Sequence, residues 1–510
     1  FSERIFGIST AGGDLAAVEA EVLLSGKVVL YILGKIISFL GFVFSVPLLL
    51  SFAYADGMQA AFSVCMGLCF LIGWVFTRTG TPYFYGKELT NREGILTVVL
   101  SWVIAALFSA LPFVLTGTLD PAGAFFEAMS GLTTTGATAL AEIEGLPISL
   151  LFWRSWMHWL GGLGIIVIFI ALLPGISGGA AHLINVEGTG FEDERILPRL
   201  QKTARALFYI YGLITAVTAA LLLCNGLTLF DAVTHAMSAI ATGGFSSYND
   251  SVAHFRSAPV EIILGIAMVI AGGNFALYYK ILHRGPGILW RDDEFRWYIT
   301  LLFLLVGVVT LDLVWETHMG VGSSLRTAFF QVASFVSTTG FVSEDYDRWP
   351  ALAKTCLLML YFTGACAGST AGGIKMSRFV VLYRGVKTGI LRVLHPHEVR
   401  GVYYNGRKID GSVFSLVVNF FYLYIGTFIV FSAAVVATGT GIGPAVTGVA
   451  ACISSTGPGF GPIVGAVGNY STLPAVAKLL LAFVMLLGRL EMYAVLVLFH
   501  RGFWRGTSRW

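Results

Sequence analysis

The sequence TTTGA at residues 133–137 decides the fold, because three related stretches follow it along the chain. They are ATGGF at 241–245, STTGF at 337–341 and SSTGPG at 454–459. Each contains Thr followed by Gly, and the glycines Gly136, Gly243, Gly340 and Gly457 are separated by 107, 97 and 117 residues. A roughly constant period of this length indicates an internal repeat. The sequence therefore predicts four copies of one structural unit.

A short amphipathic segment precedes each Thr-Gly loop. In the first, Asp120 is a suitable helix cap and Pro121 a suitable first helical residue. A helix from Pro121 to Thr134 would measure about 21 Å, too short to cross a hydrocarbon core of about 30 Å. We expect each segment to enter the membrane and return through its Thr-Gly loop. Non-helical backbone at that depth is tolerated only where it is buried in protein or lines a water-filled cavity.

Long apolar runs flank these loops. Ten runs of the kind that spans a membrane lie at 28–53, 59–77, 94–115, 152–173, 206–225, 259–282, 298–315, 353–381, 412–437 and 474–499. The chain is 56% hydrophobic and only 12% charged, whereas soluble proteins are about 25% charged. The net charge of +3 shows no basic excess for binding nucleic acid. We predict an all-α polytopic membrane protein, with four tandem span, pore-helix, loop and span repeats around a central pore and an amino-terminal two-helix hairpin.

The repeats divide the chain into six parts. We predict a cytoplasmic amino-terminal segment at 1–27, the extra transmembrane hairpin at 28–93, and pore repeats at 94–200, 201–297, 298–411 and 412–510.

Basic residues predict the orientation. Lys and Arg concentrate in alternate loops, and the loops on the other side hold only Arg256, Arg326, Arg348 and Lys354. Because cytoplasmic loops carry the excess of basic residues, we place the amino and carboxyl termini in the cytoplasm. The first 26 residues lack the basic and then apolar pattern of a cleaved signal peptide. All four Thr-Gly loops then enter from the outer side.

Four such loops suit the passage of a cation. A cation that leaves water needs oxygen ligands, and potassium channels supply them as rings of backbone carbonyls from four loops. Gly allows backbone conformations that a Cβ forbids, and Thr and Ser hydroxyls add further oxygens. The pore helices end at the loops, so their negative dipole ends favour a cation over an anion.

With these motifs, the chain resembles the membrane subunits of bacterial Trk/Ktr-type potassium uptake systems, closest to the TrkH and TrkG type, from the hairpin through all four repeats. The resemblance implies K⁺ uptake across the cytoplasmic (inner) membrane of a bacterium, with K⁺ as the transported ion and no cofactor bound by this chain. It places the K⁺-binding filter at Thr134, Thr135, Gly136, Thr242, Gly243, Thr339, Gly340, Thr456 and Gly457. Gly at all four key positions favours K⁺ over Na⁺.

A second glycine-rich cluster interrupts the eighth apolar run. It reads Gly364, Ala365, Cys366, Ala367, Gly368, Ser369, Thr370, Ala371, Gly372 and Gly373. Because each Gly costs about 1 kcal/mol in a helix relative to Ala, we expect the helix to break in the membrane. Close helix packing through small residues is the alternative. By resemblance, the cluster is an intramembrane gate below the filter, and Lys375 follows it directly.

Arg489 is a charged residue inside the last apolar run, in the sequence LLGRLEMY. A charge within the membrane is by default a functional-site hypothesis. The family has an Arg at the matching place, facing the pore near the gate loop, and pairing for folding is the alternative. Glu491 lies two residues away, on a different side of a helix, and is not its obvious partner.

The resemblance also implies partners: a second copy of the chain in a homodimer, a cytoplasmic nucleotide-binding regulatory subunit of the TrkA/KtrA kind, and membrane lipid. Two other mechanisms remain open at this point. One is a K⁺ symporter coupled to H⁺. The other is an intramembrane enzyme that uses His158 or His235 with a carboxylate, although it leaves four periodic Thr-Gly loops unexplained. We expect a transporter that is not an enzyme.

Overall fold

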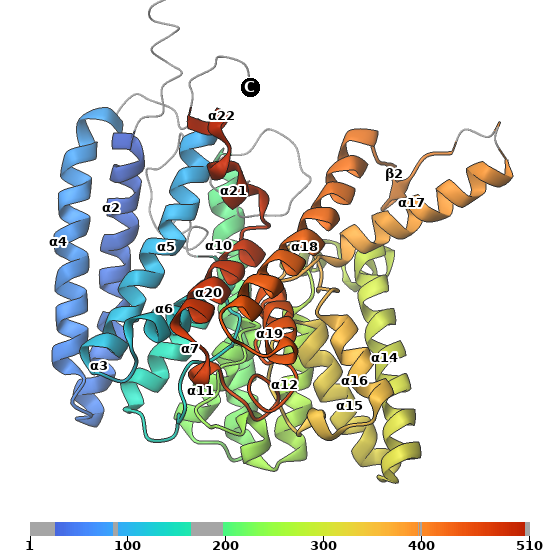
Figure 1. Ribbon diagram of the computed structural model, residues 1–510, viewed down its shortest axis with the longest axis horizontal. Helices are drawn as coiled ribbons and strands as arrows, with labels where there is room; N and C mark the ends of the chain where they lie inside the picture. The colour runs from blue at the N-terminus through green and yellow to red at the C-terminus, as the bar shows by residue number, and fades with distance from the viewer. Residues whose placement is uncertain (1–25, 85–89, 165–196, 396, 398–399, 505–510) are drawn as a thin grey trace, which may run out of the picture.

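Helices form nearly all of the regular structure in the computed structural model, which describes residues 26–84, 90–164, 197–395, 397 and 400–504 (Figure 1). Within these ranges the only strands are β1 (Tyr403–Tyr404) and β2 (Arg407–Lys408), which pair as a short antiparallel hairpin. The predicted amino-terminal segment lies almost wholly outside the described residues, as does the end of the apolar run predicted at 152–173. The all-α prediction is confirmed.

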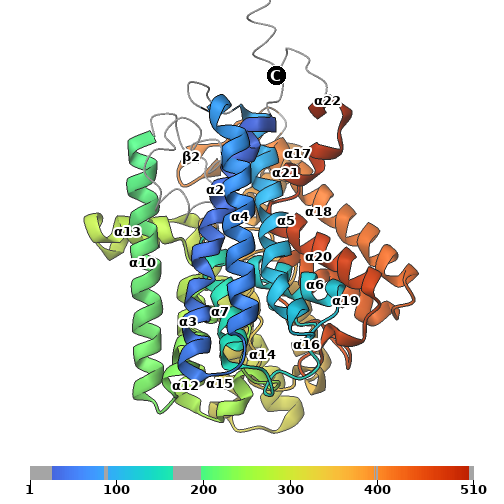
Figure 2. The same ribbon diagram turned by 90° about the vertical axis from the view of Figure 1, so that its left-hand side faces the viewer.

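The amino-terminal hairpin consists of α2 (Gly26–Val43), α3 (Ser45–Tyr54) and α4 (Gln59–Phe84). Helices α2 and α4 lie side by side at one edge of the molecule (Figures 1 and 2). Small residues allow the close approach: a Cβ on Gly34 would lie 2.6 Å from the backbone nitrogen of Thr77. Asp56, between α3 and α4, accepts a hydrogen bond from the Ser149 N–H at 2.8 Å and so joins the hairpin to the first repeat.

The four repeats follow in chain order, each with a first span, a short pore helix and a second span. The first repeat contains α5 (Asn91–Leu115), α6 (Pro121–Leu132) and α7 (Ile148–Gly162). The second contains α10 (Leu197–Cys224), α11 (Leu229–Ile240), η1 (Ser251–Phe255), α12 (Ala258–Ala271), α13 (Phe275–Arg284) and η2 (Pro286–Arg291). The third contains α14 (Asp293–Thr317), α15 (Val321–Val336), η3 (Tyr346–Arg348), α16 (Ala351–Leu360) and α17 (Met376–Leu394). The fourth contains α18 (Gly411–Ala437), α19 (Ile442–Ser454), η4 (Tyr470–Thr472), α20 (Ala475–Arg489), α21 (Tyr493–Leu496), η5 (Val497–Phe499) and α22 (Arg501–Trp504).

The four pore helices are α6, α11, α15 and α19. Asp120 caps α6, with Pro121 as its first residue, as the sequence predicts. Thr228 caps α11 by accepting from the N–H of Asp231. Helix α15 begins behind Gly320 without a side-chain cap hydrogen bond, and Ser323 and Ser324, which could cap a helix by residue type, lie inside its first turn. These helices are 12–16 residues long and therefore about 18–24 Å, which is short of a full crossing.

The spans divide into continuous and broken helices. Six apolar stretches in the described part of the chain are long enough to cross a membrane without a break. Two more are broken pairs: α12 and α13 meet at 91°, and α20 and α21 at 114°. The second span of the third repeat is also divided, because α16 ends at Leu360 and α17 begins only at Met376. The second spans of repeats 2, 3 and 4 thus all break, whereas their first spans do not.

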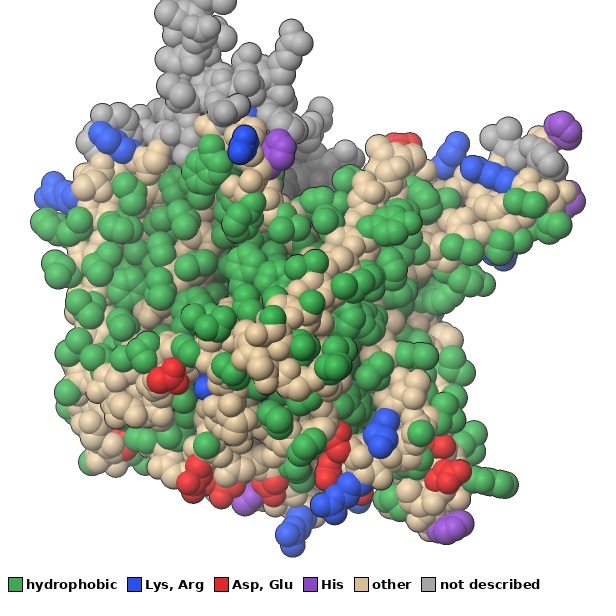
Figure 3. Space-filling model, in the orientation of Figure 1, with side chains coloured by type: hydrophobic (Ala, Val, Ile, Leu, Met, Phe, Trp, Pro, Cys, Tyr) green, Lys and Arg blue, Asp and Glu red, His purple; other side chains and the backbone are tan. Residues whose placement is uncertain are grey.

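Charged side chains lie mainly at two opposite edges of the molecule. On the face drawn in Figure 3, a broad apolar belt lies between two charged edges: Lys and Arg side chains lie at the edge that contains the upper ends of α4 and α22 and the far end of α17, and most of the Asp and Glu side chains, together with several Lys and Arg side chains, lie at the opposite edge. The pore helices lie in the half of the molecule nearer the acidic edge (Figure 1).

Candidate functional site

The segment that follows each pore helix has one backbone conformation, repeated four times. A residue with a side chain takes a left-handed φ of 53–57°, and the glycine two positions later takes a φ of 80–94°. The N–H of the residue between them donates to the carbonyl five residues earlier, at 2.8–2.9 Å. We name these the inner, middle and ring-glycine positions. The inner residues are Thr134, Thr242, Thr338 and Ser455; the middle residues are Thr135, Gly243, Thr339 and Thr456; the ring glycines are Gly136, Gly244, Gly340 and Gly457.

The second repeat differs by one residue from the register predicted by sequence. That prediction aligned Gly243 with Gly136, but Gly244 has the φ of 80° that matches a ring glycine. Gly243 occupies the middle position, where the other repeats have Thr. Because two glycines follow Thr242, the sequence alone does not show which of them takes the left-handed conformation.

The four loops close into a ring in chain order. A Cβ added to Gly136 would lie 2.2 Å from the carbonyl oxygen of Gly243 in the next repeat. The same contact recurs from Gly244 to the Thr339 oxygen (2.0 Å), from Gly340 to the Thr456 oxygen (1.8 Å), and from Gly457 to the Thr135 oxygen (2.4 Å). Each ring glycine therefore lies against the middle carbonyl of the following loop, and the fourth loop returns to the first. No residue with a Cβ fits at these positions without moving a backbone carbonyl.

Hydroxyl pairs support three of the four loops. The residue two positions before the middle residue shares a hydrogen bond with it: Thr133 with Thr135 (2.8 Å), Ser337 with Thr339 (2.7 Å) and Ser454 with Thr456 (2.9 Å). The second repeat has Ala241 and Gly243 instead. There the ring of His158 fills the space, since a Cβ on Gly243 would lie 2.3 Å from its Cγ. The ring is therefore asymmetric in its side chains although it is regular in its backbone.

His158 and His235 are both fully buried. The Nδ1 atom of His158 lies 2.8 Å from the Gly131 carbonyl, and its ring packs on Phe245 with centroids 4.1 Å apart. His235 contacts the Asp231 carbonyl through Nδ1 and the Ser246 hydroxyl through Nε2, both at 2.9 Å. Both histidines thus hydrogen-bond to a pore helix, and each contacts a residue of the second loop.

The inner hydroxyls meet the glycine-rich cluster 364–373. The Oγ1 atoms of Thr242 and Thr370 lie 3.3 Å apart, and the Gly372 N–H donates to Thr338 Oγ1 at 2.9 Å. A Cβ on Gly372 would lie 2.7 Å from Ser455 Oγ. The sequence did not single out Thr338 or Ser455, although each stands directly before a predicted filter residue. The cluster consequently lies against the inner end of three of the four loops.

The cluster forms a loop between α16 and α17, so the predicted helix break is present. Gly364, Ala365, Cys366 and Thr370 to Gly373 are buried, whereas Gly368 is exposed. Two backbone hydrogen bonds attach it to the break between α12 and α13: Cys366 N–H to Gly272 O at 2.9 Å, and Phe275 N–H to Gly368 O at 3.1 Å.

Glu294, in the first turn of α14, is a further anchor that the sequence prediction missed. Its side chain is buried, and its Oε1 atom accepts hydrogen bonds from the N–H groups of Ala367 (2.7 Å) and Ser377 (2.9 Å). The Tyr404 hydroxyl of β1 lies 3.5 Å from the other carboxylate oxygen. An acidic residue at the edge of an apolar run was the available signal, but backbone partners more than 70 positions away leave no trace in the sequence.

Arg489 joins three parts of the site. Its guanidinium donates to Thr134 Oγ1 (3.2 Å), to the Thr370 carbonyl of the cluster (2.9 Å), and to the carbonyls of Gly161 and Gly162 at the end of α7 (2.6 and 3.1 Å). It therefore lies at the inner end of the first loop, where α20 stops. Sequence analysis placed it close to the cluster, and the structure brings the two into contact.

Two other charged residues complete this region. Lys375 is buried, and its ammonium group donates to the Ala371 carbonyl within the cluster. Glu491 pairs with Arg378 of α17 rather than with Arg489, and the Arg378 guanidinium also lies over the Phe420 ring, 3.9 Å from its centroid. The ion pair links the break after α20 to the helix that follows the cluster.

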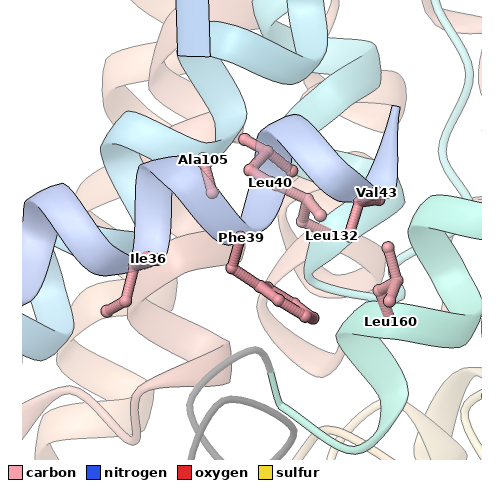
Figure 4. Close-up of a pocket in the computed structure, with 7 residues that line it drawn as sticks. All are labelled: Ile36, Phe39, Leu40, Val43, Ala105, Leu132 and Leu160. Carbon is pink, nitrogen blue, oxygen red and sulfur yellow. The ribbon is translucent and has the colours of Figure 1, made fainter. Parts of the chain in front are cut away.

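Two other features do not match a cation path. The pocket in Figure 4 is lined only by apolar side chains, among them Phe39 of α2, Leu132 of α6 and Leu160 of α7, and it offers none of the side-chain oxygens that a cation needs. Glu144, Asp250 and His254 bring ligand atoms within 4.8 Å of one another, but all three are exposed. We assign no ion to that group.

Comparison with known proteins agrees with this architecture. The family model described as TrkH, cation transport protein, matches residues 73–504. The chain is 37% identical to the Trk system potassium uptake protein TrkH of Escherichia coli K12 over 470 residues, covering 90% of this chain and 95% of that protein. It is 33% identical to the E. coli K12 protein TrkG over 467 residues, covering 90% and 94%.

A solved structure gives the same result. The crystal structure of the potassium transporter TrkH from Vibrio parahaemolyticus superposes with a TM-score of 0.85 at 32% sequence identity, covering 94% of this chain and all of that one. Family model, relatives and fold thus agree over nearly the whole sequence, and the chain belongs to the TrkH family of cation transport proteins.

Proposed function

We propose that this chain carries K⁺ into a bacterial cell through the ring of four loops, with the middle carbonyls as ligands of the ion. The observation that carries the proposal is the closed set of contacts between each ring glycine and the next middle carbonyl, such as Gly136 with Gly243. These contacts keep four backbone oxygens in equivalent positions, and a ring of carbonyls replaces the hydration shell of a cation. The names of the E. coli relatives, potassium uptake proteins, support K⁺ as the ion.

The carboxyl ends of the pore helices also favour a positively charged ion. The pore helices α6, α11, α15 and α19 each end within two residues of the inner position of the loop that follows. The carboxyl end of a helix carries a partial negative charge of about half a unit. Four such ends at one ring favour a cation and disfavour an anion.

We infer that the loop 364–373, with Lys375 and Arg489, gates the ion path below the ring. The contacts of Thr370 and Gly372 with inner hydroxyls support this position, as does the bond from Arg489 to Thr134. A cation that leaves the ring inward meets the Arg489 charge and the loop together. Movement of the loop would then open the path.

The proposal extends to partners and location. We infer a homodimer in the cytoplasmic membrane, with both termini in the cytoplasm, and a regulatory cytoplasmic subunit of the TrkA/KtrA kind. The word system in the names of the relatives supports the existence of further subunits. Because the relatives are named as potassium uptake proteins, the intramembrane-enzyme alternative is set aside.

Flux into liposomes tests the mechanism. We favour a gated channel over a symporter coupled to H⁺, because the ring offers oxygen ligands and both histidines are fully buried and hydrogen-bonded to a pore-helix carbonyl. Purified protein in liposomes should take up Rb⁺, a stand-in for K⁺, at the same rate with and without a pH gradient. Uptake that occurs only with the gradient would replace the channel by the symporter. Absence of Rb⁺ uptake under both conditions, with folded protein in the membrane, would contradict K⁺ transport itself.

A further inference from the structure

The four pore helices carry different residues at one equivalent position. Nine residues before each ring glycine stand Glu127, His235, Gln331 and Gly448. The first three are fully buried polar side chains. Burial of a polar or charged group is unfavourable unless the group is hydrogen-bonded, so the partners of these side chains indicate their purpose.

We call the residues directly after each ring glycine the outgoing leg of its loop. In the first repeat, Glu127 is hydrogen-bonded to the outgoing leg of its own loop. One carboxylate oxygen accepts from the Ala139 N–H at 2.7 Å, and both oxygens lie 3.1 Å from the Thr138 hydroxyl. Arg154 of α7 pairs with this carboxylate at 2.9 Å. The two side chains are 0% and 1% exposed, so the ion pair is shielded from water.

Arg154 also contacts the outgoing leg of the second repeat. Its guanidinium donates to the Ser246 carbonyl at 2.8 Å and lies over the Phe245 ring, 4.1 Å from its centroid. The hydroxyl of Ser246 contacts His235 at 2.9 Å. The residues that follow Gly244 are therefore held from one side by the first repeat and from the other by the second.

The third and fourth repeats reach the same result with neutral groups. The Gln331 amide donates to the Phe341 carbonyl, next to Gly340, at 3.3 Å. Gly448 has no side chain, and the Tyr470 ring occupies that space, 3.4 Å from where a Cβ would stand. The Tyr470 hydroxyl donates to the Gly457 carbonyl at 2.7 Å.

Tyr470 also links the fourth loop to the first. Its backbone N–H donates to the carbonyl of Thr138, the residue whose hydroxyl contacts Glu127, at 2.8 Å. Two further tyrosines hold the fourth loop: Tyr361 donates to the Pro458 carbonyl at 2.6 Å and Tyr346 to the Gly459 carbonyl at 2.8 Å. Every outgoing leg is thus hydrogen-bonded to a buried polar side chain from outside the loop.

We propose that these groups, with the Glu127–Arg154 pair as the principal one, are positioning residues that set the K⁺ specificity of the ring. The inference rests on the proposed function of the ring as an ion filter. Replacing a buried ion pair by apolar side chains of similar volume often leaves the stability of a protein unchanged or increases it. Stability alone therefore does not explain why an ion pair is present here. An ion pair bonded to both neighbouring loops instead fixes the distance between them, and hence the spacing of the carbonyls that select the ion.

The test compares Glu127→Gln, Arg154→Met and the double variant, with Rb⁺ uptake and Na⁺ competition measured in liposomes. We expect each single variant to lower the preference for Rb⁺ over Na⁺ by about tenfold, equivalent to about 1.4 kcal/mol. The double variant should be no worse than either single one, because the two side chains act as a unit. Ser246→Ala is a smaller change that tests the second loop, and a fall of preference is expected there also.

A more exposed ion pair on another pore helix provides the control. Glu261 of α12 pairs with Arg326 of α15 at 3.0 Å, also between a span and a pore helix. Glu261→Gln should leave the Rb⁺ preference unchanged, as judged in protein with wild-type elution and thermal stability. An unchanged preference in Glu127→Gln and Ser246→Ala would overturn the proposal. In that case Gly340→Ala tests whether the ring is still the filter. A changed Rb⁺ preference in Gly340→Ala would leave the filter assignment in place, and an unchanged preference would contradict the filter assignment as well.

Discussion

Gly457 lies against the carbonyl of Thr135, so that a Cβ on Gly457 would come within 2.4 Å of that oxygen. These residues belong to the last and the first repeat and are 322 positions apart in the sequence (457 minus 135). Their contact closes the ring of loops within one chain. A change in any one loop is consequently transmitted to the spacing of its neighbours.

Gly136→Ser should lower the selectivity for K⁺. The new Cβ would lie 2.2 Å from the Gly243 oxygen, at a φ of 81°, and a left-handed residue with a side chain costs about 1–2 kcal/mol. Relief of this contact must move the Gly243 carbonyl, so the ring becomes less suited to K⁺. We expect the Rb⁺ to Na⁺ uptake ratio in liposomes to fall by about tenfold.

Gly145→Ser is the control for this substitution, since a Cβ there has no atom within 4 Å. It should retain the wild-type ratio. Equal ratios in Gly136→Ser and Gly145→Ser would count against the ring as the filter.

The Thr-Gly loops could be predicted from sequence because each repeat needs the same residue types for the same backbone. Three of the ring glycines, Gly136, Gly340 and Gly457, follow from the motif alone. The fourth does not, because adjacent glycines at 243 and 244 satisfy the motif in two registers. The helix break at 364–373 was predictable for a similar reason, since small residues do not sustain a helix.

The long-range supports of the site were beyond sequence reasoning. Glu294 bonds to backbone N–H groups of Ala367 and Ser377, which every residue except proline possesses. Arg154 likewise bonds to the Ser246 carbonyl. Hydrogen bonds to backbone atoms depend on how the chain folds and select no residue type at the partner position. The sequence therefore revealed the loops themselves but few of the side chains that hold them.

Arg489→Ala should raise basal Rb⁺ flux in liposomes in the absence of any regulatory partner. The change removes a positive charge beneath the ring and three sets of hydrogen bonds, to Thr134, Thr370 and the end of α7. A barrier lowered by about 1.4 kcal/mol raises a rate about tenfold. Arg489→Lys separates the two causes, because it keeps the charge but has no planar guanidinium. Flux at the wild-type level in Arg489→Lys assigns the barrier to charge, and increased flux assigns it to the tethering bonds. Unchanged flux in both variants would contradict a role in gating.

Glu294→Gln should also increase basal flux by loosening loop 364–373. The carboxylate now accepts from two N–H groups, at Ala367 and Ser377, and hydrogen bonds to a charged group contribute about 1.5–3 kcal/mol each. A neutral amide is a weaker acceptor, so the loop should leave its closed position more often. Rb⁺ flux is the measurement, and Glu316→Gln, at an exposed position near the other end of α14, is the control. If the two variants show the same flux, Glu294 supports folding only.

Asp56→Ala should lower the free energy of unfolding by about 1–3 kcal/mol, because it leaves the Ser149 N–H at the start of α7 without its acceptor. Burial alone would raise the pKa of Asp56, but hydrogen bonds from Ser51, Ser149 and Met58 outweigh it and hold the pKa below the ordinary value of 3.8. A carboxyl with a depressed pKa contributes its full stability above the unfolded value and loses it as the pH falls through the folded value.

The Tm difference between wild type and Asp56→Ala in detergent should consequently be constant from pH 5 upward, where about nine-tenths or more of such carboxyls are ionised even in the unfolded chain. It should shrink as the pH falls below 3.8. Asp410→Ala is a matched control, because Asp410 precedes α18 without a side-chain cap bond. A Tm difference that stays the same at low pH would show that the Asp56 side chain acts by packing rather than through its charge.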